Sequence, residues 1–211
     1  MKKYKVLSTV LLVSLVMAGC GSSNANSGAA ASTDKAETAT AEEAVKEETK
    51  AEETTEIDNS LISNYDLFEV TSANLNGGKW DDIVSYTDKG SNHSPELSWE
   101  SVDGASSYVV YMVDTSMVYW VHWKSEGITE TSLPEGWASE TEYIGPYPPE
   151  GGTHTYEIYV IALKNPVERV KGSLNGQNPK FESFLGDLDT DADGNTGNVV
   201  GAGHIVGTFT N

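Results

Sequence analysis

Hydrophobic residues gather in short runs after Leu61, and glycine, proline, asparagine and aspartate separate these runs. This pattern is typical of β-strands joined by turns. It predicts strands at residues 68–72, 96–99, 107–113, 118–123, 155–163 and 204–210. Helical periodicity is rare, and residues 180–188 are the best short helix candidate. The sequence therefore predicts one mainly β domain over residues 61–211, a sandwich or compact barrel with few short helices.

Residues 21–60 have a different composition, with no aromatic side chain and mostly Ala, Glu, Thr, Ser and Lys. Such a segment cannot bury enough apolar surface to offset the entropy that it would lose on ordering. We therefore expect a disordered acidic tether whose only role is to give the domain distance and hydration.

The first 20 residues combine a basic start, an apolar run from Val6 to Met17 and the sequence Ala18-Gly19-Cys20. They resemble a bacterial lipoprotein signal peptide, with cleavage before Cys20 and attachment of lipid, palmitate included, to this cysteine. The apolar run is too short to span a bilayer as a helix. An uncleaved signal anchor is the alternative. The prediction is a protein anchored to the cell membrane by lipid and facing outside the cytoplasm.

Charge restricts the partners of the domain. The chain has a net charge of −19, of which residues 1–20 contribute +3 and residues 21–60 contribute −7, so residues 61–211 have a net charge of −15. Nucleic-acid binding is not expected, because neutralising phosphates requires clustered Lys and Arg. Cys20 is the only cysteine, so no internal disulfide can form and stability has to come from packing.

Polar residues next to predicted strands form a candidate site. Asp114 ends one hydrophobic run, His122 lies in the next, and His154 and Tyr156 stand two residues apart at the start of a third. Residues two apart in a strand face the same side, and Asp114 is placed to orient one imidazole. Two imidazoles, a tyrosine hydroxyl and the amides of the Gly/Pro-rich loop at 143–153 would make a small pocket for phosphate or carboxylate.

The order of these segments resembles the phosphatidylethanolamine-binding protein family, in particular its bacterial branch related to Raf kinase inhibitor protein. The resemblance covers residues 66–165, and its segments are Asn92 to Trp99, Val113-Asp114, His122-Trp123, Gly145-Pro146 to Tyr156, and Tyr159 to Leu163. It implies a central antiparallel β-sheet and a pocket for phosphoryl or similar anionic groups, such as a phospholipid headgroup. The ligand-binding residues that it implies are Asp114, His122, Gly145, Pro148, Pro149, His154 and Tyr156.

One segment departs from the family. Its Asp-Pro-Asp-Ala-Pro run is here Asp114-Thr115-Ser116-Met117, without the second acid and both prolines, which leaves the identity of the ligand open. Taken alone, His122 is better explained as a buried histidine with backbone partners, and it is its place beside Asp114, His154 and the Gly/Pro-rich loop that favours the pocket. The aromatic residues Trp99, Trp123 and Tyr159 are expected to belong to the core.

A second motif suggests a candidate cofactor, a calcium ion. Residues 187–195 resemble the first half of a calcium loop, in which Asp189, Asp191, Asp193 and Asn195 would supply oxygen ligands. A complete EF-hand is excluded, because Val200 stands where its bidentate glutamate is needed. The alternatives are a different kind of Ca²⁺ loop and a solvated loop of Asx turns.

Three function classes follow. The first is a binding module that holds a small anionic ligand. The second is a hydrolase with His122 or His154 as base, although the chain has no Gly-x-Ser-x-Gly elbow and its only cysteine is Cys20. The third is a protein-interaction module whose surface is controlled by the pocket, for which the sequence indicates no particular protein partner.

Overall fold

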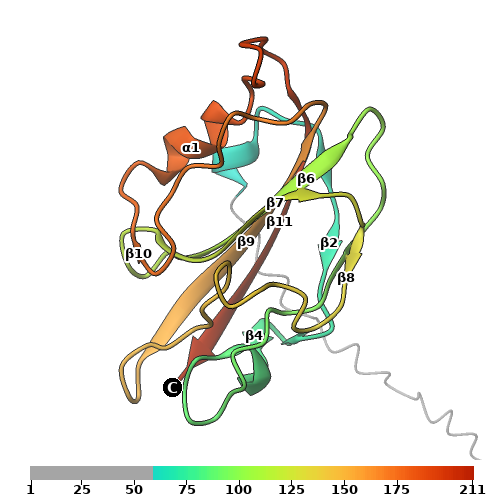
Figure 1. Ribbon diagram of the computed structural model, residues 1–211. Helices are drawn as coiled ribbons and strands as arrows, with labels where there is room; N and C mark the ends of the chain where they lie inside the picture. The colour runs from blue at the N-terminus through green and yellow to red at the C-terminus, as the bar shows by residue number, and fades with distance from the viewer. Residues whose placement is uncertain (1–58) are drawn as a thin grey trace, which may run out of the picture. The chain divides into compact units, whose positions relative to one another are not determined.

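The computed structural model describes residues 59–211 (Figure 1). The elements are η1 (Ser60–Ile62), β1 (Leu67–Phe68), β2 (Val70–Thr71), β3 (Leu75–Asn76), β4 (Lys79–Trp80), η2 (Asp82–Val84), β5 (Leu97–Trp99), β6 (Ser107–Asp114), β7 (Trp120–Ile128), β8 (Ser132–Leu133), β9 (Thr153–Leu163), β10 (Gly176–Gln177), α1 (Phe181–Asp187) and β11 (Val199–Thr210). No helix within this part of the chain is long and apolar enough to cross a membrane. The predicted signal peptide, Cys20 and the tether up to residue 58 lie outside the described residues.

Four long strands, β6, β7, β9 and β11, form the centre of the main sheet. Its strand order is β10-β7-β6-β9-β11-β4-β3, and the long strands pair antiparallel. The sheet is mixed, because the short strands β1 and β4 pair with β11 in parallel. The strands β2, β5 and β8 form a second, three-stranded sheet. The expected mainly β fold is confirmed, with parallel pairs added at one side of the antiparallel centre.

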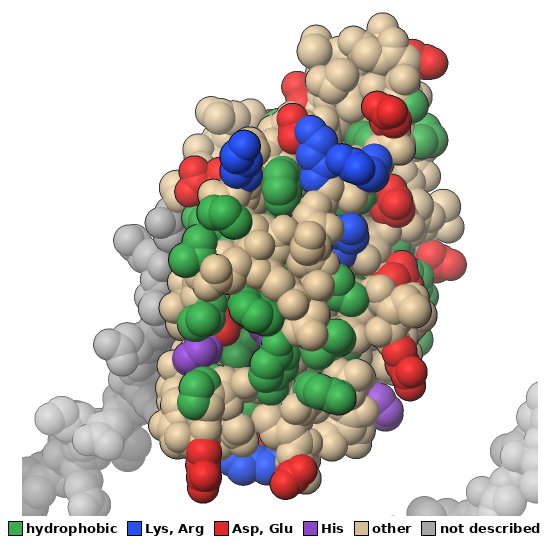
Figure 2. Space-filling view, turned by 60° about the vertical axis from the view of Figure 1, so that its left-hand side comes forward, with side chains coloured by type: hydrophobic (Ala, Val, Ile, Leu, Met, Phe, Trp, Pro, Cys, Tyr) green, Lys and Arg blue, Asp and Glu red, His purple; other side chains and the backbone are tan. Residues whose placement is uncertain are grey.

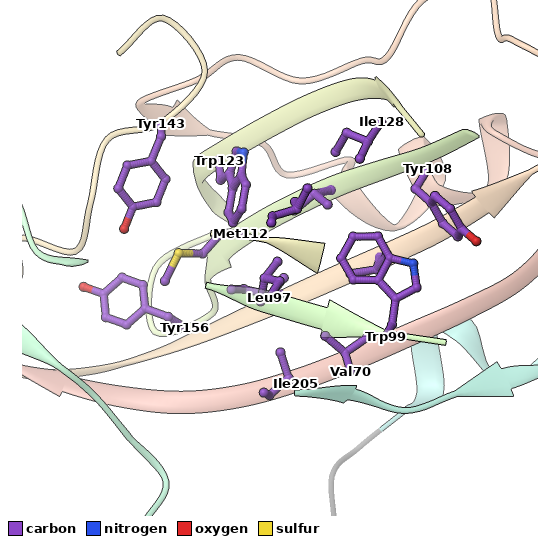
Figure 3. Close-up of a cluster of buried hydrophobic side chains, with 14 of the residues drawn as sticks. Val70, Leu97, Trp99, Tyr108, Met112, Trp123, Ile128, Tyr143, Tyr156 and Ile205 are labelled. Carbon is purple, nitrogen blue, oxygen red and sulfur yellow. The ribbon is translucent and has the colours of Figure 1, made fainter. Parts of the chain in front are cut away.

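The main sheet is buried on both faces. Side chains alternate along β9, so that Tyr156, Ile158 and Val160 pack toward the second sheet (Figure 3). Tyr159 and Ile161 pack instead with α1, which lies on the other side of the long strands (Figure 1). Because both faces are covered, the central strands have nearly continuous hydrophobic sequences. The predicted core positions Trp99, Trp123 and Tyr159 are buried.

The predicted strands and the short helix are all present, but some boundaries differ. β7 continues beyond residue 123 to Ile128, and β11 begins at Val199 rather than at His204. The strands β3, β4, β8 and β10 were not predicted, because two residues are too few to show a period. Asn59 and Ser60 belong to the folded domain rather than to the tether, since the Asn59 side chain contacts His204 Nδ1 at 3.1 Å.

A β-bulge in β7 positions one residue of the candidate site. Met112 pairs with Trp123 and the next residue, Val113, pairs with Val121. His122 is therefore an extra residue in β7 that has no partner on β6. An extra residue of this kind is left unpaired and changes where neighbouring side chains point. The bulge therefore places the His122 side chain at the end of β6, beside Asp114.

Candidate functional site

A cavity of about 330 Å³ lies where β6 ends and β7 and β9 begin. It is lined by Asp114, Met117, Trp120, His122, Tyr147, Pro148, Pro149, His154 and Tyr156. Figure 2 shows hydrophobic side chains gathered near histidine in the lower half of one face of the domain. The structure thus brings six of the seven predicted pocket residues together, and only Gly145 is not in the lining.

Asp114 is buried at the end of β6 and holds His154 in a fixed orientation. One carboxylate oxygen, Oδ2, lies 2.6 Å from His154 Nδ1. The other oxygen, Oδ1, accepts the backbone N–H groups of Ser116 at 2.9 Å and Met117 at 3.2 Å. Because a carboxylate only accepts, His154 Nδ1 carries the proton of this bond. The Nε2 atom of His154 has no hydrogen-bond partner among the described residues, which leaves it for a ligand in the cavity.

His122 is held by backbone carbonyls rather than by an acid. Its Nδ1–H donates to the carbonyl oxygens of Ile144 at 2.7 Å and Gly145 at 3.1 Å. Burial lowers the pKa of this imidazole, and the opposing effects of the Ile144 carbonyl and the Asp114 charge do not reverse the shift. His122 is therefore neutral at pH 7, and its Nε2 presents a lone pair, since Nδ1 carries the single proton.

Gly145 supports the site from behind the cavity wall. A Cβ at this position would lie 2.0 Å from the Val84 carbonyl oxygen, so that only glycine fits. The Gly145 N–H donates to the Asn92 side chain at 2.7 Å, which fixes the carbonyl that His122 uses. The predicted role of Gly145 as part of the wall is corrected to a positioning role. Asn92 belongs to the family-like segment from Asn92 to Trp99, but nothing in the sequence indicates its contact with Gly145.

Tyr156 lies between the two imidazoles. Its ring centroid is 5.2 Å from that of His122 and 6.5 Å from that of His154. Burial, and then the nearby Asp114 charge, raise the pKa of the Tyr156 hydroxyl, so it stays protonated. This hydroxyl is buried without a hydrogen-bond partner among the described residues. A buried polar group of this kind is costly unless something satisfies it, and a ligand in the cavity would do so.

Aromatic residues form a rim that the sequence did not assign to the pocket. Trp120 Nε1 donates to the Asn175 side-chain oxygen at 3.2 Å, and the Tyr147 hydroxyl donates to the same oxygen. Met117, which is 40% exposed, completes the rim. The spacing of Trp120 and His122 was the available signal, since the two residues were expected to face the same side. The rim gives the cavity apolar walls around a polar floor.

The acidic loop near the C-terminus has the hydrogen bonds of an Asx turn, one of the two alternatives that the sequence left open. The Asp191 carboxylate accepts the backbone N–H groups of Asp193 and Asn195 and the Asn195 amide, and the Asp189 carboxylate accepts those of Gly197 and Val199. No group of three or more His, Cys, Asp or Glu between residues 59 and 211 is arranged to hold a metal. The loop is built as an Asx turn, whose amide donors occupy the carboxylate oxygens.

Stability is expected to fall between pH 7.5 and 5.5 because of His122. Its folded pKa lies below the unfolded value of about 6.5, so the unfolded chain takes up a proton first as the pH falls. The stability of the folded state relative to the unfolded state is therefore highest above the unfolded pKa of His122, and it decreases as the pH falls from there toward the folded pKa. His122→Asn keeps a donor for the Ile144 carbonyl but does not titrate. Thermal melts should show a smaller decrease in Tm for the variant over this range.

Glu157 does not interfere with that experiment. Burial opposes its ionisation, but hydrogen bonds from His204 and Tyr159 hold its pKa below the ordinary value of 4.5, so its contribution is lost only at lower pH. At pH 8 the side chain at position 122 is neutral in the unfolded state of both proteins, which then differ only by the cost of the substitution. Equal slopes for wild type and variant between pH 7.5 and 5.5 would contradict the assignment.

Comparisons with known proteins agree with this architecture. Residues 71–210 match the phosphatidylethanolamine-binding protein family. A phosphatidylethanolamine-binding protein homologue from Chlamydia trachomatis has a similar structure, with a TM-score of 0.51 and 22% identity over 69% of this chain and 99% of its own. YbcL from Escherichia coli, described as a new member of the mammalian family, gives a TM-score of 0.51 and 22% identity over 68% of this chain and 98% of its own. No match was found among curated proteins.

The family match covers residues 71–210, which is most of the described domain, and the mainly β fold agrees with it. The chain belongs to the phosphatidylethanolamine-binding protein family. The resemblance stated from the order of its motifs is thereby confirmed.

Proposed function

We propose that this protein is a binding module that holds a small ligand with a phosphate monoester or similar anionic group in the 330 Å³ cavity. The observation that carries the proposal is that the Tyr156 hydroxyl, buried without a hydrogen-bond partner among the described residues, lies at the same cavity as His122 and His154, whose Nδ1 atoms are held by the protein and whose Nε2 atoms are left for a ligand. These atoms come from two strands and converge on one space. Their chemistry fits a compact group with several oxygens.

The mixture of donors and acceptors indicates which anion fits. Tyr156 donates, and His154 donates through Nε2 once it is protonated beside Asp114. Neutral His122 accepts, so it suits an oxygen that still carries a proton. A phosphate monoester in its monoanionic form provides one P–OH and several acceptor oxygens. The apolar rim of Trp120, Tyr147 and Met117 suits a short organic substituent on that phosphate.

A hydrolase is the competing function, because Asp114 and His154 form a pair suited to general base catalysis. Hydrolysis through a covalent intermediate would also need a nucleophile. The residues that line the cavity include no serine, threonine or cysteine, but their carboxylate, imidazoles and phenols can also act as nucleophiles. Measured phosphate release therefore decides between the two functions.

His154→Ala is expected to weaken binding of phosphorylethanolamine at least tenfold, the loss of about 1.4 kcal/mol or more that removing a charged hydrogen-bond donor causes. Calorimetric titration measures this change, and phosphate release measured in parallel tests for turnover. The matched control is His93→Ala, because His93 pairs with Glu135 and lines no part of the cavity.

A sulfate ester is the second control ligand, since it has no proton to donate to His122 at a pH where the phosphate monoester is monoanionic, and it should bind more weakly there. Equal affinity of wild type and His154→Ala would overturn the proposal. Release of phosphate by wild type but not by His154→Ala would favour the hydrolase.

We further propose that a lipid on Cys20 anchors the mature protein to the cell membrane, with the domain outside the cytoplasm. The support is the sequence of residues 1–20, with its apolar run and Ala18-Gly19-Cys20. A single anchor followed by a long polar segment would let the domain meet ligands at some distance from the bilayer. Cys20→Ser should release the protein from the membrane fraction, and continued membrane association would argue against the anchor.

A further inference from the structure

The short edge strand β10 brings a loop from late in the chain to the rim of the candidate site (Figure 1). In β10, Gly176 pairs with Val121 and Gln177 pairs with Trp120, the first residue of β7. The N–H of Asn175 donates to the Val121 carbonyl oxygen at 2.8 Å. Asn175 is therefore held beside the start of β7, where the cavity opens.

The backbone on both sides of Asn175 is fixed by one buried side chain, that of Asn178. Its Nδ2 donates to the carbonyl oxygens of Ser173 at 3.0 Å and Gly176 at 2.7 Å, and its Oδ1 accepts the Ser173 N–H at 2.8 Å. Asn175 has a φ of +56°, in the left-handed region that asparagine enters more readily than most residues. The loop thus presents the Asn175 side chain in one defined place.

The Asn175 side chain joins two aromatic residues of the rim. Trp120 Nε1–H donates to its Oδ1 at 3.2 Å, and the Tyr147 hydroxyl donates to the same oxygen. An indole nitrogen can only donate, so the amide atom that it meets has to be the oxygen. Burial raises the pKa of the Tyr147 hydroxyl, which therefore keeps its proton for this bond. One oxygen thus connects β7 with the loop at 145–149.

Asn175 acts on the cavity only through these two rings. Trp120 and Tyr147 line the cavity, whereas Asn175 does not. Both rings are partly exposed, so packing alone leaves them other rotamers. The Tyr147 ring also lies near the floor of the site, with its centroid 5.5 Å from that of His122. The hydrogen bonds to Asn175 therefore fix the rim relative to the floor.

We propose that Asn175 is a positioning residue that sets the preference of the site for the organic substituent of its ligand. The inference rests on the function proposed above. Asn175 holds Trp120 and Tyr147 in place before the ligand arrives, so that their ordering does not reduce the affinity. The phosphate group meets the polar floor and is not affected. A flat apolar substituent gains most, because it packs against the two aromatic rings.

The test is titration of the full chain with phenyl phosphate and with inorganic phosphate. Asn175→Gly removes the oxygen and still allows the positive φ, whereas Asn175→Asp keeps an acceptor oxygen and is the matched control. We expect wild type to prefer phenyl phosphate. Asn175→Gly should bind phenyl phosphate about threefold to tenfold more weakly, the usual effect of having to order a side chain on binding, and inorganic phosphate within about twofold of wild type. In Asn175→Asp the ratio of the two affinities should return to that of wild type.

The ratio distinguishes positioning from a general effect on the fold. Equal weakening of both ligands in Asn175→Gly, or an unchanged ratio, would overturn this inference and leave the proposed function intact. Wild type that binds neither ligand would overturn both.

The indole N–H resonance of Trp120 gives a readout without ligand. Its absence from the NMR spectrum of Trp120→Phe identifies it. The resonance should move in Asn175→Gly and move back toward its wild-type position in Asn175→Asp. An unmoved resonance would show that Asn175 does not hold the ring, and would overturn the inference whatever the titrations give.

Discussion

Gly145→Ala is expected to destabilise the domain by about 3 kcal/mol or more, which is at or above the upper end of the usual cost of overpacking. The added Cβ would lie 2.0 Å from the Val84 carbonyl oxygen and 2.9 Å from two further backbone atoms. Backbone atoms cannot move aside as the end of a flexible side chain does. The loop at 145–149 therefore has to shift, and the carbonyl that accepts the His122 Nδ1–H shifts with it. Chemical denaturation measures the loss of stability.

Gly186→Ala is the matched control for that experiment. Gly186 lies in α1, and a Cβ there meets nothing within 4 Å. Alanine at a helical position of this kind is expected to stabilise by about 0.5–1 kcal/mol. A Gly145→Ala protein as stable as wild type would show that the loop tolerates a side chain and that Gly145 does not position His122.

The strands could be predicted from the sequence where their hydrophobic pattern is long, and β11 shows why a boundary was missed. Its first half contains Gly201 and Gly203, which the sequence suggests as turn residues. In the structure a Cβ on Gly203 would lie 2.4 Å from a Val70 methyl group, because β2 crosses directly over the strand. Glycine is required there by close packing rather than by a turn. Packing between distant segments is not visible in local sequence.

The candidate site was predictable in its polar residues and less so in what holds them. Side-chain alternation placed His154 beside Tyr156, and a strand end placed Asp114 near them. The partners of His122 are carbonyl oxygens, which every residue has, so no sequence pattern marks Ile144 or Gly145 as acceptors. The Asx turn of the acidic loop could not be distinguished from a calcium loop for a related reason: the donors to Asp191 Oδ1 are backbone amides, which almost every residue has.

Asp114→Ala is expected to remove phosphorylethanolamine binding and to destabilise the domain by about 3–5 kcal/mol, the usual cost of breaking a buried charged pair. The substitution leaves His154 Nδ1 and the backbone N–H groups of Ser116 and Met117 without their acceptor. Calorimetric titration and chemical denaturation measure the two effects. Asp88→Ala makes the same chemical change at an exposed position and should alter stability by less than about 0.5 kcal/mol.

Asp114→Asn separates the charge of this residue from its hydrogen bonds. The amide oxygen can still accept from Ser116 and Met117, so the loss of stability should be smaller, about 1–2 kcal/mol. The amide nitrogen, however, donates toward His154 Nδ1 and forces its proton to Nε2. The Nε2–H of this tautomer can still donate to the anion, so calorimetric titration should show a smaller loss of phosphorylethanolamine affinity than in Asp114→Ala. An affinity as low as that of Asp114→Ala would show that the negative charge of Asp114, and not only its hydrogen bonds, is needed to hold the ligand.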